Sequence, residues 1–420
     1  MAYVSIILFW FIILLLCFYI FRQKEGHYKF SFFFILVTIL YLGVQLLIFN
    51  DLEGDDYVYE ISAYVIYTLL VNAAVIFGFR VGEKGKISPN NIKIVVLNTK
   101  LPFILLLVIV LLAFYSYLKL STMMGGINAM YNGGANDVVW EGATVKYTFA
   151  IQNLYFVIPI SLFLWKRLGM SSFLILAVLS SLIPLANAIL LNRRFALFLL
   201  ATTIYLFLYF QCNFKLKKIF MVILAPAGMA VVTLFPLLRS EYSFDQALDK
   251  SGLSGINMLI GNSYGEVKNA TLGLAASITD MNNNFALGFI KQIFKDFVPS
   301  SIIGRDLKTE ILGSDNLRQI VVDTYNYYIP SHEFVTGITT SYYELGMFAL
   351  ALWCAIGYFF GKQWAKAKLG DLKCQVMYTA MIPAGLMALY YSPTAALSQA
   401  IKVYIVVNLC FILSRVKANK

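Results

Sequence analysis

The sequence predicts an all-α membrane protein with about eleven spanning helices and one large extracytoplasmic loop. Apolar residues make up 60% of the 420 residues and charged residues only 13%, whereas soluble globular domains carry about 25% charged residues. Apolar runs of about 20 residues recur along the chain, which is the length that crosses roughly 30 Å of hydrocarbon. The runs do not alternate polar with apolar residues, so helices are favoured over a membrane β-barrel.

Most of the predicted spans precede the large loop. In chain order the spans cover residues 3–21, 30–49, 57–78, 101–118, 147–165, 171–190, 195–211, 219–238, 337–360, 375–391 and 396–414. We therefore divide the chain into a membrane domain at 1–238, an outer loop with helical segments at 239–336, and a second membrane part at 337–420. The first run has no basic residues before it and no small-residue cleavage site after it, so we interpret it as a retained span.

The distribution of lysine and arginine predicts the orientation of these spans, because cytoplasmic loops are enriched in both. An N-terminus on the outer side and a C-terminus in the cytoplasm place most cations on the inner side: Arg22, Lys24, Lys29, Arg80, Lys84, Lys86, Lys93, Lys100, Lys166, Arg167, Lys215, Lys217, Lys218, Lys362, Lys366, Lys368, Lys373, Arg415, Lys417 and Lys420. The formal net charge of +11 does not indicate a nucleic-acid partner, since these cations punctuate apolar runs instead of gathering on one exposed face.

The outer loop is too long to be a simple connector, and loops of such length are usually functional. Residues 257–287 within it follow a helical pattern but are too polar to span the membrane. We expect this segment to lie on the outer membrane surface or to cap a cavity.

Arginines at the outer ends of two spans are candidate anion ligands. Arg193 and Arg194 lie at an outer helix end, where the orientation rule does not favour them, and Arg239 ends the span before the outer loop at the same level. A guanidinium group pairs with two phosphate oxygens at once, so these residues fit a lipid-linked phosphate. Arg305 and Arg318 in the outer loop would complete the site. Snorkelling toward head groups is the alternative for the first pair, and simple solvation for the last.

Glu344 and His332 are the candidate proton acceptors. Glu344 falls about two turns inside the span at 337–360, and a carboxylate at that depth is expected to be buried, paired or functional. His332 precedes that span on the outer side. Either group would take a proton from a sugar hydroxyl, and a structural ion pair with an arginine is the alternative for Glu344.

Other patterns are less informative. No phosphate-binding loop, nucleophile elbow or zinc-ligand spacing occurs, so we predict neither a metal nor a cofactor. Gly357 and Gly361 form a G-x-x-x-G pattern, which favours helix packing within the chain over dimerisation.

The layout resembles the Wzy-type polymerases of lipid-linked oligosaccharide repeat units, which are related to O-antigen ligases. Arg194-Phe-Ala-Leu is similar to the Arg-Gly-Ala-Leu helix start of that family, and Arg239 matches the arginine before its large loop. Thr339-Thr-Ser-Tyr-Tyr-Glu-Leu-Gly is similar to the family's Glu-x-Gly entry after the loop. The chain lacks the ligases' His-Asn pair just before Glu344, and His332 lies nearby instead.

The resemblance implies a GT-C-like architecture in a bacterial inner membrane and an inverting, metal-independent glycosyl transfer on its periplasmic face. Donor and acceptor would be glycans linked to undecaprenyl pyrophosphate, and the product an O-antigen or capsule. Arg193, Arg194, Arg239, Arg305 and Arg318 would hold the pyrophosphate, with Glu344 or His332 as base. Membrane lipids and a chain-length regulator would be partners. A flippase or exporter of the same glycans is the first alternative, and a non-catalytic assembly partner the second.

Overall fold

The structure is a computed structural model that describes residues 2–46, 58–85, 99–123, 125–126, 147, 150–190, 194–215, 217, 267–279, 290, 293, 316–329 and 335–413. Within these ranges all regular elements are helical and none is a strand. Among the described residues, six helices are long and apolar enough to cross a membrane. The predicted class of an all-α membrane protein is thereby confirmed, whereas the count of eleven spans and the extent of the outer loop stay predictions.

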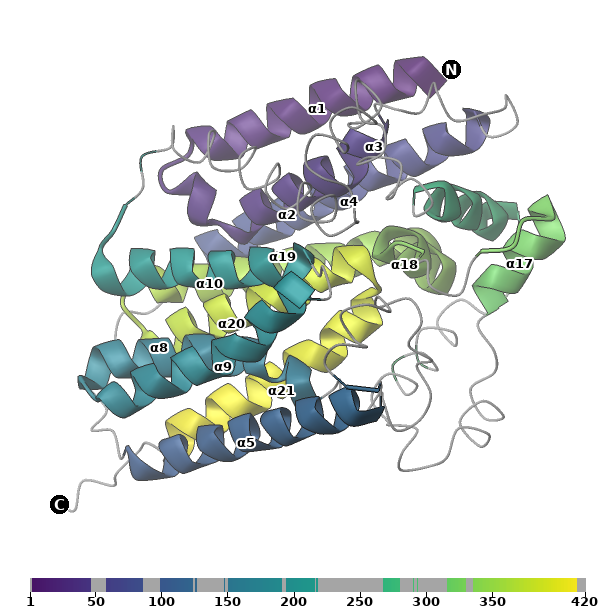
Figure 1. Cartoon of the computed structure of the whole chain (residues 1–420). Coiled ribbons are helices and arrows are strands. Elements are labelled where there is room, and N and C mark those ends of the chain that lie inside the picture. The colour runs from purple at the N-terminus through teal and green to yellow at the C-terminus, as the bar shows by residue number, and fades with distance from the viewer. Residues whose placement is uncertain are drawn as a thin grey trace, which may run out of the picture.

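The helices run side by side across the molecule (Figure 1). The first part holds α1 (Ala2–Arg22), η1 (Gly26–Tyr28), α2 (Phe30–Thr38), the π-helical η2 (Ile39–Gly43), α3 (Val44–Leu46), α4 (Val58–Lys84) and α5 (Lys100–Met123). The middle holds α8 (Leu154–Leu168), α9 (Ser171–Leu190) and α10 (Arg194–Cys212). The last part holds α17 (Asn316–Tyr325), α18 (Gly337–Leu345), η6 (Gly346–Phe348), α19 (Ala349–Lys368), α20 (Leu372–Tyr390) and α21 (Pro393–Leu413).

Two predicted spans differ from a simple helix. The span at 30–49 contains the π-helical turn of η2 before α3. The span at 337–360 is broken after α18, because Gly346 adopts φ 57° and ψ −141°, a conformation that essentially only glycine reaches without strain. α18 is therefore a separate helix of nine residues. The predicted span at 219–238 lies outside the described residues.

Helices α4 and α19 pack with their backbones in direct contact through two pairs of glycines. A Cβ atom at Gly357 or Gly361 would collide with the carbonyl oxygens of Val75 or Phe79 on α4. Gly78 and Gly82 face the α19 backbone in the same way. Residue numbers rise together along both helices, so the two are parallel. The G-x-x-x-G of α19 thus serves packing within the chain, as predicted, because small residues let helices approach closely in lipid.

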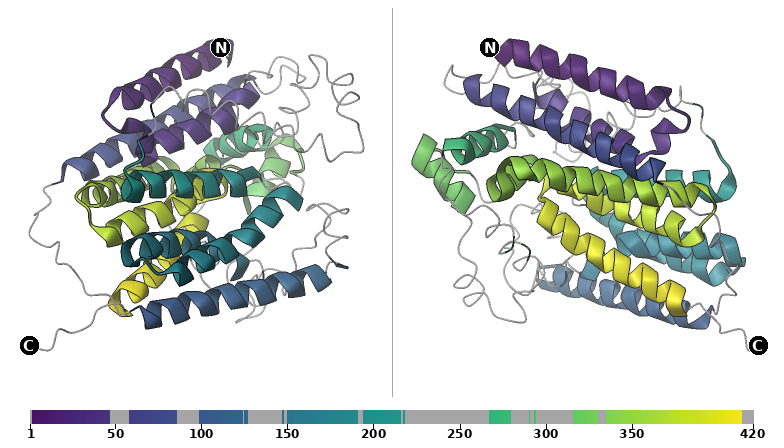
Figure 2. Two further views of the ribbon diagram at one scale, coloured as in Figure 1. Left: turned by 60° about the vertical axis from the view of Figure 1, so that its left-hand side comes forward. Right: turned by 180° about the vertical axis from the view of Figure 1, so that it is seen from behind.

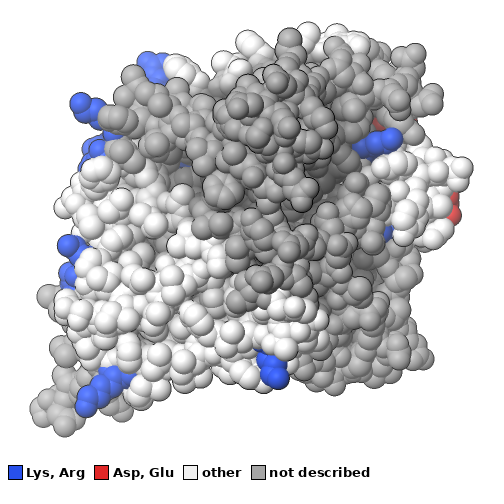
Figure 3. All heavy atoms as spheres, in the orientation of Figure 1, with Lys and Arg blue, Asp and Glu red and all other residues white. Residues whose placement is uncertain are grey.

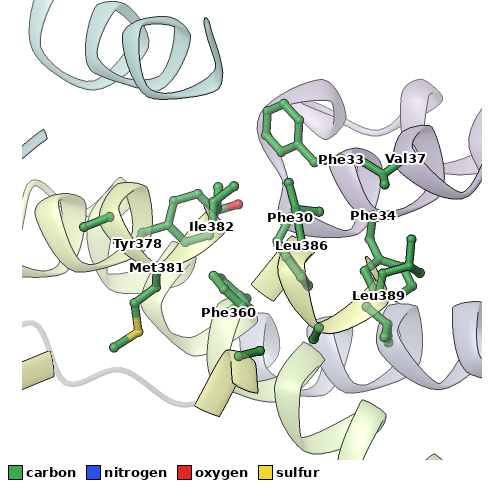
Figure 4. Packing of buried hydrophobic residues seen from close by; sticks show 14 of the residues in the cluster. Phe30, Phe33, Phe34, Val37, Phe360, Tyr378, Met381, Ile382, Leu386 and Leu389 are labelled. Atoms are coloured by element: carbon green, nitrogen blue, oxygen red, sulfur yellow. The ribbon is translucent and has the colours of Figure 1, made fainter. Parts of the chain in front are cut away.

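A dense aromatic core joins α2, α19 and α20 (Figure 4). The rings of Phe30 and Phe360 stack with centroids 3.8 Å apart, and a Cβ atom at Gly385 would lie 2.6 Å from Phe360 and 2.7 Å from Phe30. Gly385 therefore gives the stacked pair its room. Close packing of this kind is the main force between helices in lipid, where apolar burial alone gives little.

Ion pairs tie the connection between α1 and α2 to the ends of other helices. Lys29 pairs with Glu83 at the end of α4 at 2.8 Å. Glu25 pairs with Lys368 at the end of α19 at 2.8 Å, and with Lys215 after α10 at 3.5 Å. Burial alone would raise the pKa of the Glu25 carboxyl, but the hydrogen bond and positive charge of Lys368, supported by Tyr209 and Lys215, hold that pKa below its ordinary value.

Positive charge gathers at this end of the bundle. Figure 3 shows most of the visible Lys and Arg side chains along the edge of the molecule where α1, α8 and α10 end. The assignment of this end to the cytoplasmic side stays a prediction. The opposite end of the bundle carries α17 and α18 (Figure 2).

Candidate functional site

Helix α18 begins at a point that three other elements fix. Gly337 lies so close to α20 that a Cβ atom there would collide with the Ala388 carbonyl oxygen. The hydroxyls of Thr336 and of Tyr64 on α4 form a hydrogen bond of 3.1 Å. Thr339 Oγ1 donates a hydrogen bond of 2.7 Å to the carbonyl oxygen of Ala270, which lies in the helix at residues 267–279. The start of α18 therefore has little freedom to move.

The second turn of α18 is joined to α19 and α4 by aromatic side chains. Trp353 on α19 donates from its indole nitrogen to Ser341 Oγ at 3.0 Å, and Ser341 itself donates to the Ile338 carbonyl oxygen at 2.7 Å. Tyr67 on α4 meets Tyr342 edge to face, with ring centroids 5.0 Å apart. These contacts fix the angle between α18 and α19 across the break at Gly346.

Glu344 lies in the last turn of α18 and is only 7% exposed. Gly337, Thr340 and Glu344 are spaced so that they share one helix face. Gly337 packs on α20. Thr340 Oγ1 is within hydrogen-bond distance of the Gly337 carbonyl oxygen at 3.2 Å, and it also lies 3.4 Å from the Tyr391 carbonyl oxygen in the turn between α20 and α21. The Glu344 carboxyl is therefore carried on the face that meets the α20–α21 turn. Ionisable groups buried within membrane helices are usually functional.

Part of the predicted outer loop forms a small core of its own beside α18. The described buried apolar residues of this core are Leu272, Ala276, Leu317, Val321, Ile329 and Val335. They join the helix at 267–279 to α17, and the two helices lie together at one end of the molecule (Figures 1 and 2). The helix at 267–279 falls within the segment predicted to be helical. A Cβ atom built at Gly273 would lie 3.0 Å from the side chain of Thr339 and 3.2 Å from that of Val335. The helix at 267–279 therefore packs closely against the start of α18.

Only some of the predicted site residues lie within the described part of the structure. Glu344 is buried on α18, Arg318 is half-buried on the neighbouring α17, and Arg194 opens α10. Figure 1 shows the start of α10 turned toward the end of the bundle that carries α17 and α18. The Arg194 side chain, and the residues Arg193, Arg239, Arg305 and His332, lie outside the described part. The convergence of the arginines on one anion stays a prediction.

Sequence reasoning missed several aromatic residues at this end of the bundle. Tyr41 of η2 meets Tyr390 at the end of α20, with ring centroids 4.6 Å apart, and Tyr390 meets Tyr391 at 4.9 Å. All three tyrosines are half-buried. A tyrosine pair followed by Ser-Pro at a helix end is a signal for a structured turn, but no sequence pattern connects Tyr41 with residues so far along the chain.

Metal ligands were not predicted, and within the described ranges no group of three or more His, Cys, Asp and Glu side chains is placed to hold a metal ion. Comparison with models of known families, with characterised proteins and with solved structures finds no match to this chain. Its function is therefore inferred from its own side chains and their arrangement.

Proposed function

We propose that this chain is a glycosyl transferase that joins lipid-linked oligosaccharide repeat units into a long polysaccharide on the outer face of a bacterial inner membrane. In this proposal the N-terminus is periplasmic and the C-terminus cytoplasmic. The donor is a growing glycan on undecaprenyl pyrophosphate, and the acceptor is the terminal sugar of a single lipid-linked repeat. A chain-length regulator is the proposed protein partner.

The observation that carries the proposal is the buried position of Glu344. Its carboxyl lies at the end of a short helix that is fixed by α4, α20 and the helix at 267–279, at the end of the bundle opposite the cationic edge. A general base must lie within hydrogen-bond reach of the proton that it takes, and a carboxylate on a fixed helix has a defined position from which to do so.

The reaction can be written with the residues at hand. The acceptor hydroxyl oxygen attacks the anomeric carbon of the donor sugar as the bond from that carbon to the pyrophosphate oxygen breaks. Glu344 takes the hydroxyl proton, and His332 is the alternative base. The configuration at the anomeric carbon is inverted, because a single displacement occurs.

Arginine would stabilise the leaving group. The pyrophosphate gains negative charge as the glycosidic bond breaks, so fixed guanidinium groups stabilise the transition state more than the ground state. Arg194 opens α10 and Arg318 lies on α17, and we propose that they act together with Arg193, Arg239 and Arg305.

The test is the length profile of surface glycans after deletion of the gene in its host. The proposal predicts that a ladder of long chains collapses to single repeat units that still reach the outer leaflet. Lipid-linked units that accumulate facing the cytoplasm would contradict it and favour the flippase alternative. An unchanged ladder would contradict both.

A further inference from the structure

Three tyrosines from distant parts of the chain form one aromatic cluster at the outer end of the bundle. Tyr41 and Tyr390 lie with their rings tilted by 41° and their centroids 4.6 Å apart. Tyr390 and Tyr391 are 4.9 Å apart with their rings at 66°. We name Tyr41, Tyr390 and Tyr391 the tyrosine platform. All three residues are partly exposed.

The tyrosine platform lies beside the candidate base. Thr340 Oγ1 lies 3.4 Å from the Tyr391 carbonyl oxygen, and Glu344 follows Thr340 by one turn on the same face of α18. The turn that carries Tyr391 is stiffened by a hydrogen bond of 3.0 Å between the hydroxyls of Ser392 and Thr394. The platform and the carboxyl therefore belong to adjoining surfaces of α18 and the α20–α21 turn.

Tyrosines at membrane surfaces often form a belt that faces the head groups, and the platform differs from such a belt. Other tyrosines of the spanning helices, among them Tyr115 and Tyr404, point outward and are 56% and 52% exposed. The platform tyrosines instead contact one another, and they lie where α18 meets the end of α20. A belt does not require contact between rings from η2 and the α20–α21 turn.

We propose that the tyrosine platform binds a pyranose ring of the lipid-linked glycan and presents its hydroxyl to Glu344. The face of an aromatic ring carries negative charge density, which attracts the positively polarised C–H groups on one face of a sugar ring. This inference rests on the proposed function and adds to it a substrate contact that the arginines and Glu344 do not supply.

Binding of the sugar portion alone tests this inference. The probe is the oligosaccharide repeat released by mild acid from the lipid carrier of the deletion strain, and its affinity for the purified full-length protein is measured by calorimetry. Tyr390→Leu and Tyr391→Leu keep apolar bulk but remove the ring, and we expect each to weaken binding about 10-fold, the effect of roughly 1.4 kcal/mol. Tyr390→Phe and Tyr391→Phe keep the ring and should stay within about 3-fold of wild type. Tyr404→Leu, on the exposed face of α21, is the matched control and should bind as wild type does.

The possible results test sugar binding by the tyrosine platform separately from the proposed polymerase reaction. Thermal unfolding first shows that each variant is folded. Equal sugar affinity of wild type and of all the Leu variants would then overturn the proposal that the tyrosine platform binds the sugar. Absence of binding by wild type would also overturn it. In either case the glycan length profile in cells decides the polymerase proposal separately, because that profile reports chain growth and not sugar affinity. Loss of binding confined to the Leu variants of Tyr390 and Tyr391 supports the platform.

Discussion

Trp353 donates a hydrogen bond to Ser341 across a break in a membrane helix. The indole nitrogen and the serine oxygen are 3.0 Å apart, and Gly346, where the backbone leaves the helix, lies between them in sequence. Both side chains are fully buried. The bond therefore fixes the angle between α18 and α19, and Glu344, one turn beyond Ser341, is held by the same contact.

Removing this hydrogen bond is expected to destabilise the protein and to lower its activity. Ser341→Ala leaves the Trp353 indole N–H buried without its partner, which costs about 1–3 kcal/mol. The free energy of unfolding in detergent measures the loss. In a double-mutant cycle with Trp353→Phe, we expect the two changes to be non-additive by about 1 kcal/mol or more. Additive effects would show that the bond does not couple the two helices.

The glycine contacts between α4 and α19 predict a second loss of stability. Gly357→Ala places a methyl group against the Val75 carbonyl oxygen, so the two backbones must move apart, at a cost of about 1–3 kcal/mol or more. Gly85→Ala is a suitable control, because Gly85 is exposed after the end of α4 and its nearest neighbour is 3.3 Å from an ideal Cβ. A midpoint of thermal unfolding that falls equally in both variants would contradict the described packing.

The Glu25 ion pairs predict that stability depends on pH. The pKa of the folded Glu25 carboxyl is lower than its ordinary value of 4.5, so the contribution is fully present above that value and is lost as the pH falls through the folded pKa. Glu25→Gln should remove about 1 kcal/mol at pH 7, and the difference from wild type should shrink on acidification. Thermal unfolding measured between pH 7 and pH 3 tests this. A difference that stays constant over this range would show that Glu25 stabilises through packing and not through charge.

The shape of the arginine side chain predicts different results for two substitutions of Arg194. If Arg194 pairs with two phosphate oxygens of the donor, Arg194→Ala should abolish long chains, and Arg194→Lys should restore them only weakly, because an ammonium group cannot form the paired bonds. The glycan ladder of each variant gives the measurement, with protein level in the membrane as the control. Full activity of Arg194→Lys would mean that positive charge alone suffices.

The sequence predicted helices well because the bilayer fixes the length of an apolar run. α1, α5 and α21 coincide with predicted spans for this reason. The break at Gly346 was not predicted, since a glycine within an apolar run is compatible with a continuous helix. It depends on tertiary contacts of Gly337, Thr339 and Ser341 that no local pattern contains.

The candidate site was predicted only in part. Glu344 stood out because a carboxylate is rare within an apolar run, and its burial agrees with that expectation. The tyrosine platform could not be found in the same way, because Tyr41 and Tyr390 are brought together only by the packing of η2 near the end of α20. Tyrosine is also common at membrane surfaces for reasons unrelated to ligands.

The most direct test of the central claim is the product made by purified protein in lipid vesicles that contain single-repeat lipid-linked glycans. We predict that wild type forms chains of two or more repeats and releases the lipid pyrophosphate, and that Glu344→Gln slows this reaction by about 10²–10⁴-fold. Asp323→Asn, which changes an exposed carboxyl on α17, should remain active as the control. Failure of wild type to lengthen the glycan, or a Glu344→Gln variant as fast as wild type, would contradict the account.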